Sequence, residues 1–306
     1  MAGSSHIRTG VPAGPLAPHY DGFLSSLRSK RPETRGTYGR ALREFVRWHG
    51  RKRSAGLTTG DVRRYKAYLT DEKRLTDVSV STYLTAVRRF CAYLVRRGVL
   101  SENPALRVGG NSSPRIHSRA PLTAAEAGAL LAVVDRTGER GARDYAFIML
   151  MLACGLSEIE IIRADAGDIL RDAGEARLRV QGKGRLRKDQ SVALPAEALA
   201  ALQGYLALRG ALAESDPLFA SAGNRTRGTR MTTRGVRDRV SQYMARSGLR
   251  SSARRRITPY SLRHTAALLL AGSGASADEI RTRMRLGSLS TAKLYIAQSR
   301  DNHTGS

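Results

Sequence analysis

The sequence predicts a mainly α-helical fold with a small β-sheet, in which an N-terminal helical bundle is followed by an α+β domain. Apolar residues recur at helical spacing along most of the 306 residues, a length that allows about two domains. The alternation typical of strands is confined to ARLRVQGKGRLRKDQSVALP, residues 176–195. The stretch GGNSSPRIHSR, residues 109–119, is rich in turn formers and lacks any period, so we expect the linker between the domains there.

The charge of the chain gives the first indication of a partner. The chain holds 52 Lys and Arg against 26 Asp and Glu, for a formal net charge of +26 and an isoelectric point near 11.2. A hydrophobic content of 41% is enough for real cores and excludes a disordered chain. This excess predicts a polyanionic partner, double-stranded DNA first of all; an arginine-rich solvated surface is the alternative.

Cysteine and histidine usage gives no sign of a metal or another cofactor. Cys91 and Cys154 both lie in apolar helical surroundings, which predicts neither a disulfide nor a metal site. The six histidines are scattered without metal-binding spacing. The N-terminus has no signal-peptide core, and no run of about 18 apolar residues occurs, so we expect a cytoplasmic protein that does not span a membrane.

The N-terminal domain is expected over residues 17–108, after a flexible Gly-, Pro- and Ser-rich arm over residues 1–16. Four helices are expected in it: FLSSLRSK, the run TRGTYGRALREFVRWHG capped by Thr34, VRRYKAYL, and SVSTYLTAVRRFCAYLVRRG. In the last of these the apolar residues share one face, namely Val80, Leu84, Val87, Cys91 and Leu94. Four such helices make a small bundle.

Basic residues on the outer faces of this bundle are candidates for phosphate contacts, which position a duplex without reading its sequence. Any one of them alone is more often a solvated surface charge, so the prediction concerns the set. Its members are Arg40, Arg43, Arg47, Arg63, Arg64, Lys66, Arg88 and Arg89.

The C-terminal domain is expected over residues 120–306. Thr123 and Glu126 form a capping box that opens its first helix. The stretch ARDYAFIMLMLACGLSEIEIIRADAGDI then predicts a buried helix, a break at Gly155 and a second helix that ends before Asp168. The strands of residues 176–195 follow as a hairpin with a basic turn, and another helix begins after Pro195.

A basic loop and helix come next, NRTRGTRMTTRGVRDRVSQYMARSGL, residues 224–249. We predict that this segment faces DNA, because it holds the densest arginine cluster in the chain; a solvated surface is the alternative. The arginines predicted to contact DNA are Arg225, Arg227, Arg230, Arg234 and Arg237.

Three short helices are expected between residues 256 and 295. Thr258 is placed to cap the first helix, with Pro259 at its first position, and Gly272 and Gly274 end it. Its helical spacing predicts that Leu262, Ala266 and Leu269 share a face that packs against the core. A second face, with Tyr260, Arg263 and Ala267, is expected to be available for function. Ser276 and Glu279 form a capping box for the second helix, and Ser290 or Thr291 caps a third helix that carries Tyr295.

The sequence of this last stretch resembles the C-terminal box of the tyrosine recombinases, the phage-integrase family. That box reads approximately TPHxLRHTxAxxLxxxG and then LGHxSxxTTxxY, and this chain has TPYSLRHTAALLLAGSG and then MRLGSLSTAKLY. The resemblance implies that Tyr295 is the nucleophile and that Arg263 is the second of two phosphate-holding arginines. His264 is in register, and Tyr260 stands where histidine is usual, with a hydroxyl that can still donate to a phosphate oxygen.

The resemblance extends over about residues 19–297 and assigns a role to the basic hairpin turn. Lys183 matches the lysine of the family's GKGxK turn, which implies that it is the general acid for the departing 5′-oxygen. Lys188 and Arg187 lie close enough in sequence to compete for that role. A basic hairpin tip that touches backbone phosphates is the alternative for this turn.

Two positions depart from the family pattern. Ser157 stands where the family has its first catalytic arginine, in CGLSEIE against TGLRxSE, and it carries no charge. Leu286 stands where the family has histidine or tryptophan, and Arg285 occupies the preceding glycine position. Leucine cannot donate a hydrogen bond. Arg285, or one of Arg281 and Arg283, is close enough in sequence to supply the missing charge.

The resemblance implies an α-helical core-binding bundle joined to a tyrosine-recombinase catalytic domain that cuts and rejoins DNA through a 3′-phosphotyrosyl link. No metal or nucleotide is needed, since the covalent bond conserves the energy of the phosphodiester. The resemblance also implies a homodimer on a DNA site and a tetramer in synapsis. An accessory directionality factor is a possible further partner. Two alternatives stay open: a non-catalytic DNA-binding relative, and a monomeric type IB topoisomerase.

Overall fold

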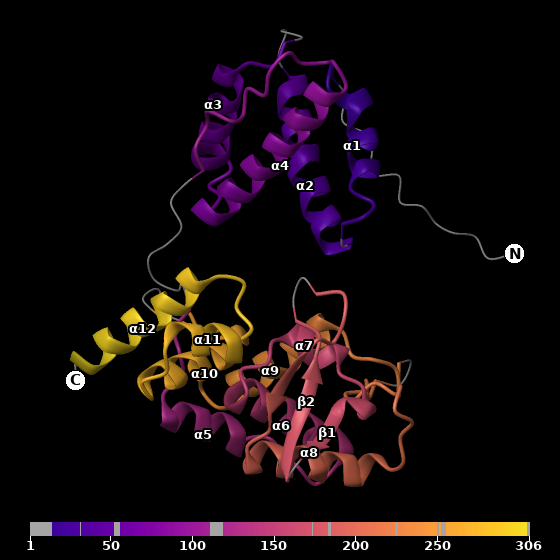
Figure 1. Ribbon diagram of the computed structural model, residues 1–306, viewed down its shortest axis with the longest axis vertical. Coiled ribbons are helices and arrows are strands. Elements are labelled where there is room, and N and C mark those ends of the chain that lie inside the picture. Colours follow the sequence, from indigo (N-terminus) through magenta and orange to yellow (C-terminus); the bar gives the residue numbers. More distant parts are fainter. Residues whose placement is uncertain are drawn as a thin grey trace, which may run out of the picture. The chain divides into compact units, whose positions relative to one another are not determined.

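The computed structural model describes residues 14–30, 32–51, 56–110, 119–172, 174–182, 185–223, 226–249, 251 and 255–304. The chain forms two compact units, residues 1–113 and residues 114–306 (Figure 1). Both are mainly helical, and the second contains a small sheet, so the predicted fold class is confirmed. Residues 1–13 of the predicted arm and residues 111–118 of the predicted linker lie outside the described residues.

The first unit is a helical bundle around one apolar core. Its α-helices are α1 (Tyr20–Ser26), α2 (Pro32–Gly50), α3 (Thr59–Ala67) and α4 (Asp77–Arg96), with a short turn η1 (Ala17–His19) before α1 and a π-helical turn η2 (Tyr68–Glu72) after α3. The apolar face predicted for α4 is confirmed, because all five of its residues are at most 1% exposed. The start predicted for α2 is wrong. This helix begins at Pro32 rather than after Thr34, since proline suits the first helical turn.

The second unit packs helices against a three-stranded antiparallel sheet in the order β1-β2-β3. The strands are β1 (Ile169–Asp172), β2 (Glu175–Val180) and β3 (Gln190–Ala193), with Ile169 opposite Leu178 and Leu178 opposite Val192. The hairpin of β2 and β3 is as predicted. The strand β1 was not predicted, because four residues that follow the short turn η3 (Ala166–Asp168) show no alternation long enough to detect.

The helices of the second unit place its core around a central buried helix. They are α5 (Ala124–Ala132), α6 (Glu139–Ala153), α7 (Glu158–Arg163), α8 (Ala196–Arg209), α9 (Thr233–Arg246), α10 (Tyr260–Gly272), α11 (Ala277–Arg283) and α12 (Leu289–Thr304). On α6, Phe147, Ile148 and Leu150 are fully buried in the larger core of this unit. The three C-terminal helices α10, α11 and α12 gather beside it around a smaller cluster that includes Ile280 and Tyr295 (Figure 1).

The capping boxes predicted from local sequence are present. Thr123 and Glu126 close one at the start of α5, and Ser276 and Glu279 close one at the start of α11. The cap predicted for α12 is wrong. Leu289 begins this helix, and the hydroxyl of Ser288 accepts from the Thr291 N–H at 3.4 Å.

The start and the faces predicted for α10 also differ from the structure. The helix begins at Tyr260, and the Thr258 hydroxyl is buried without a partner among the described residues; instead the Thr258 N–H donates to Ser261 Oγ at 3.1 Å. Leu269, predicted to pack, is 68% exposed, whereas Arg263, predicted on the face available for function, is 6% exposed. Helices α6, α11 and α12 all pack against α10, and nine of its residues are buried, so a one-faced pattern does not describe it.

Candidate functional site

Arg263 is held by backbone and carboxylate oxygens from two other segments. Its Nη1 donates to the carbonyl oxygen of Gly155 and to Oε2 of Glu160, both at 2.7 Å. Its Nη2 donates to the carbonyl oxygen of Met284. The guanidinium thus joins α10 to the start of α7 and to the end of α11, which fixes its orientation.

Glu160 is the common acceptor of this cluster and lies 2% exposed. The Ser157 N–H and Oγ donate to its Oε2 at 2.8 and 2.7 Å, so Ser157 caps α7. Burial by itself raises the pKa of Glu160, but the guanidiniums of Arg263 and Arg285 outweigh it and hold this pKa below its usual range. The carboxylate is therefore ionised at neutral pH.

Arg285 reaches the same carboxylate from the turn after α11. Its Nε donates to Glu160 Oε1 at 2.5 Å, and its Nη2 donates to the Gly155 carbonyl at 2.8 Å. The side chain is 3% exposed. Of the three arginines predicted to replace the missing charge, Arg285 is the one brought to Ser157 and Glu160. Arg281 pairs instead with Asp278 on the exposed side of α11, and Arg283 is exposed.

Tyr295 lies on α12 against α10, and its ring centroid is 5.1 Å from that of His264. Tyr295 is 1% exposed and His264 is also 1% exposed. Burial raises the pKa of Tyr295, and the neighbouring Tyr260 raises it further, whereas the charges of Arg263 and Arg119 act in the opposite direction. The predicted residues Tyr295, His264, Arg263 and Tyr260 are thus brought together.

Arg119 is a member of this site that sequence reasoning missed. Its guanidinium carbon lies 4.8 Å from the centroid of the Tyr260 ring, a cation–π contact. It belongs to the predicted linker, and no local pattern connects it with a residue 141 positions away. The adjacent Ala120 N–H donates to the Arg256 carbonyl at 2.9 Å, which ties this segment to the start of α10.

Leu286 packs, partly buried, against the apolar cluster of the C-terminal helices. Its side chain has no donor, so this position supplies packing rather than a hydrogen bond.

Cys154 is buried, and burial raises its pKa to about 11, so its thiol is unreactive at neutral pH.

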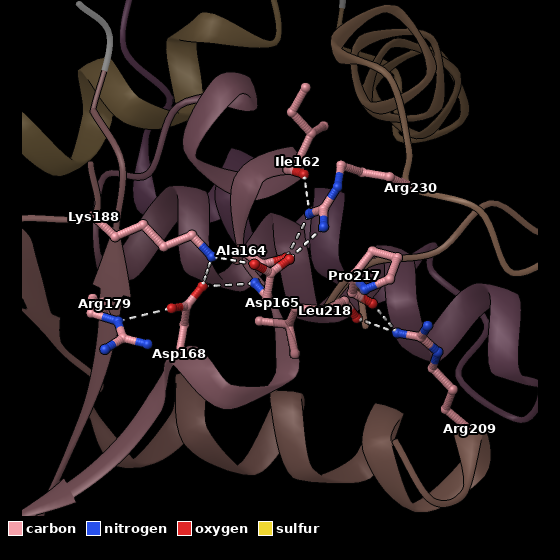
Figure 2. A network of polar contacts seen from close by, with 10 residues as sticks. All are labelled: Ile162, Ala164, Asp165, Asp168, Arg179, Lys188, Arg209, Pro217, Leu218 and Arg230. Atoms are coloured by element: carbon pink, nitrogen blue, oxygen red, sulfur yellow. Dashed lines mark hydrogen bonds and ion pairs between the residues drawn. The ribbon is translucent and has the colours of Figure 1, made fainter. Parts of the chain in front are cut away.

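The hairpin of β2 and β3 is anchored by a network of ion pairs (Figure 2). Lys188 donates to Asp165 at 2.5 Å and also to Asp168, and Arg179 donates to Asp168 at 2.9 Å. The ammonium of Lys188 is thus held between two carboxylates on the turn after α7 (Figure 2). Lys183, the predicted general acid, lies outside the described residues, so its role stays a prediction.

The predicted DNA-contacting arginines of the second unit lie at several kinds of position. The guanidinium of Arg230 donates hydrogen bonds to the Asp165 carboxylate and to the carbonyl oxygens of Ile162 and Ala164 (Figure 2). These contacts hold Arg230 against the end of α7. The other described members stay largely exposed, each within 4 Å of one acidic side chain: Arg227, Arg234 and Arg237. Arg225 lies outside the described residues.

The basic residues of the first unit also divide into two groups. Arg88 and Lys66 donate to carbonyl oxygens of residues 105–109, so they hold the segment after α4. The exposed members are Arg40, Arg47, Arg63, Arg64 and Arg89, and Arg43 is half-buried. Arg40 and Arg43 also line, with Arg35, a cavity of about 470 Å³ against Tyr20 and Leu24. Because three arginines line this cavity, it is a candidate for a phosphate contact.

The described residues contain no cluster of His, Cys, Asp and Glu side chains that could hold a metal ion. No helix within the described ranges is both long enough and apolar enough to cross a membrane.

Comparison with known proteins identifies the family. A model of the phage integrase family matches residues 121–302, and a model of the phage integrase N-terminal SAM-like domain matches residues 18–98. This chain belongs to the phage integrase family. The resemblance predicted from the motifs is confirmed, and with it the class of function, which is site-specific recombination; membership of this family implies DNA strand transferase activity.

Relatives of this integrase-family chain are similar over nearly their whole length. The tyrosine recombinase XerC of Pelobacter propionicus is 32% identical over 285 residues, which cover 91% of this chain and 89% of the relative. The tyrosine recombinase XerC of Myxococcus xanthus is 29% identical over 287 residues, with 92% of each covered.

Solved structures show the same fold at low identity. The XerH site-specific recombinase bound to a palindromic difH substrate gives a TM-score of 0.73 at 17% identity, over 93% of this chain and 82% of that chain. A lambda integrase dimer bound to a COC' core site gives 0.69 at 17% identity, over 92% of this chain and 94% of that chain.

Proposed function

We propose that this integrase-family chain cleaves and rejoins DNA strands with Tyr295 as nucleophile. The phenol oxygen bonds to the phosphorus of a phosphodiester, the bond to the 5′-oxygen breaks, and a 3′-phosphotyrosyl link and a free 5′-hydroxyl result. The phenol proton passes to solvent water and the 5′-oxygen takes a proton from Lys183; reversal of these steps with another 5′-hydroxyl rejoins the strand. No cofactor enters the reaction.

The observation that carries this proposal is the meeting of α10 and α12. Tyr295 packs on His264 with ring centroids 5.1 Å apart, and Arg263, the neighbour of His264 in sequence, is oriented by Gly155 and Glu160. We assign Arg263 to the non-bridging phosphate oxygens, where negative charge develops during the reaction. Tyr260 and His264 supply hydrogen-bonding groups from the same helix.

The nucleophile is covered in this conformation, because Tyr295 is 1% exposed. A phosphodiester reaches the phenol only when α12 shifts relative to α10. Exposure also removes the burial that raises the pKa of Tyr295, and the charge of Arg263 then favours the phenolate. Binding of DNA and activation of the nucleophile are thus coupled in the proposed reaction.

The proposed assembly is a homodimer on duplex DNA and a tetramer in synapsis, with room for an accessory directionality factor. The lambda integrase dimer on its core site supports the dimer, and the DNA-bound structures and the net charge of +26 support DNA as the partner. The phosphate contacts are assigned to the exposed arginines of both units, with Arg40, Arg43 and their cavity as the clearest group.

The experiment that tests the proposal is the trapping of a covalent adduct. The probe is a nicked duplex whose sequence the protein itself has selected from a random duplex library; loss of the short fragment beyond the nick prevents rejoining. The wild type is expected to form an adduct that survives denaturing gel electrophoresis. Tyr295→Phe is expected to abolish the adduct, because the attacking hydroxyl is lost. Duplex affinity is expected to stay unchanged, because the rest of the side chain is kept.

A second candidate, a non-catalytic DNA-binding relative, is favoured by Ser157 and Leu286, which lack the expected charge and donor. The same experiment decides between the two. If the wild type forms no adduct on a duplex that it binds, strand transfer is excluded and the non-catalytic function replaces it.

A further inference from the structure

We propose that Arg285 supplies the second positive charge of the phosphate-binding site, acting through Glu160 rather than by touching DNA. The inference rests on the proposed function, since it concerns how Arg263 binds the phosphate. Arg285 is therefore a positioning residue, and its contribution is electrostatic.

The charges of the cluster explain why a second cation is needed. Arg263 donates to Glu160 at 2.7 Å, and that carboxylate is 2% exposed. Alone, this pair has no net charge, and a neutral buried pair offers little attraction to a phosphate. Arg285 donates to the other carboxylate oxygen at 2.5 Å, so the three side chains together keep one positive charge. Glu160 is then neutralised by Arg285, and the charge of Arg263 remains for the substrate.

Arg285 occupies a strained backbone conformation, and its side chain makes several contacts that offset the strain. Its φ of 52° lies in the left-handed region, where a residue other than glycine is strained. The Arg285 N–H donates to the Thr282 carbonyl, and the Leu286 N–H donates to the Arg281 carbonyl, which is the turn that ends α11. Glycine would make this turn without strain. The contacts of the guanidinium with Glu160, Gly155 and Arg283 offset the strain.

The close packing at Gly155 holds the guanidiniums of Arg263 and Arg285 at the same carbonyl oxygen. Gly155 has a φ of 59°, and a Cβ there would lie 2.4 Å from Met284 Cε, so the two segments are in close contact. Both guanidiniums donate to the Gly155 carbonyl, Arg263 at 2.7 Å and Arg285 at 2.8 Å. Ser157 lies two residues further on and carries no charge. The guanidinium of Arg285 thus occupies the space beside the uncharged position.

The test uses single-turnover adduct formation on the selected nicked duplex, with protein in excess. Arg285→Gly removes the charge and suits the left-handed turn, and we expect it to slow adduct formation by about 100-fold. Glu160→Gln in the Arg285→Gly background removes the negative charge as well and returns the cluster to one positive charge. This double variant is expected to recover at least about tenfold of the rate. Melting temperature and duplex affinity are measured for each variant.

A purely structural role predicts the opposite for the double variant, since removal of a second buried partner further weakens the cluster. A second readout is a duplex whose scissile phosphate carries a methyl group in place of one non-bridging oxygen. This phosphate is uncharged, so the ratio of wild-type to Arg285→Gly rates is expected to fall towards one.

The outcomes separate the two proposals. An unchanged rate in Arg285→Gly, or a double variant no faster than Arg285→Gly, overturns the electrostatic role of Arg285 while strand transfer stands. Absence of an adduct with the wild type overturns strand transfer itself, and the inference about Arg285 with it.

Discussion

Tyr295 experiences two opposing effects in the structure, and its reactivity depends on their balance. Burial raises the pKa of its phenol, whereas the charges of Arg263 and Arg119 act in the opposite direction. Arg119 lies 4.8 Å from the Tyr260 ring and comes from the segment that leads into the second unit. This arginine therefore belongs with the candidate site, although it was predicted as part of the linker.

Arg119→Ala is expected to slow adduct formation by about tenfold, because a cation beside Tyr295 and Tyr260 is lost. Arg119→Lys keeps the charge and is the matched control, with most of the rate retained. The measurement is the single-turnover rate at saturating protein, so that a change in duplex affinity does not enter. Equal rates for wild type and Arg119→Ala would remove Arg119 from the site.

Among the residues of the candidate site, the sequence predicted those that stand in a family motif and missed those that do not. Arg263, His264 and Tyr295 stand in one motif and meet in the structure. Arg285 was one of three arginines considered, because only tertiary structure shows which of them reaches Glu160. Arg119 had no signal at all, since its contact with Tyr260 joins residues that are far apart in the chain.

The hairpin of β2 and β3 holds Lys188 in place by ion pairs. Lys188 is held by Asp165 and by Asp168, which is 1% exposed, and these contacts attach the hairpin to the turn after α7. A lysine engaged in this way has lost the freedom that proton transfer to a leaving group requires. We therefore retain Lys183 as the proposed general acid.

Lys183→Met is expected to slow adduct formation by about 100-fold with an unchanged melting temperature. Lys188→Met, the matched substitution in the same hairpin, is expected to lower the free energy of unfolding by about 1–3 kcal/mol, because buried Asp168 loses a partner. A duplex with sulfur as the bridging 5′-atom restores the rate of Lys183→Met, since a thiolate leaves without a proton. A larger rate loss in Lys188→Met, rescued by the same sulfur, would assign the acid to Lys188.

Among the elements, local signals predicted the capping boxes of α5 and α11 but not the cap of α12. The capping boxes of α5 and α11 satisfy backbone N–H groups within four residues, so sequence alone reveals them. The faces of α10 depend on what surrounds the helix, and Leu269 is exposed although its spacing predicted packing. Strand β1 is short and takes its conformation from pairing with β2, which no window of the sequence shows.

For the whole molecule, two compact units are joined near residue 113, and each has its own apolar core. Arg88 and Lys66 hold residues 105–109 to the first unit, whereas Arg119 and Ala120 contact the second. The domain boundary that we propose therefore lies within residues 109–119.

Brief trypsin treatment is expected to cut first within residues 109–119, which include Arg115 and Arg119, and to leave two stable fragments. The fragments are identified by intact mass. First cleavage inside residues 120–300 would contradict the proposed boundary.

The most direct test of the account is to find which residue becomes linked to DNA. The trapped adduct is digested with nuclease and trypsin, and the peptides that carry a nucleotide are sequenced by mass spectrometry. We predict the nucleotide on Tyr295, in the tryptic peptide LYIAQSR of residues 294–300. A nucleotide on another residue, such as Tyr260 in the peptide ITPYSLR of residues 257–263, would contradict the assignment of the nucleophile.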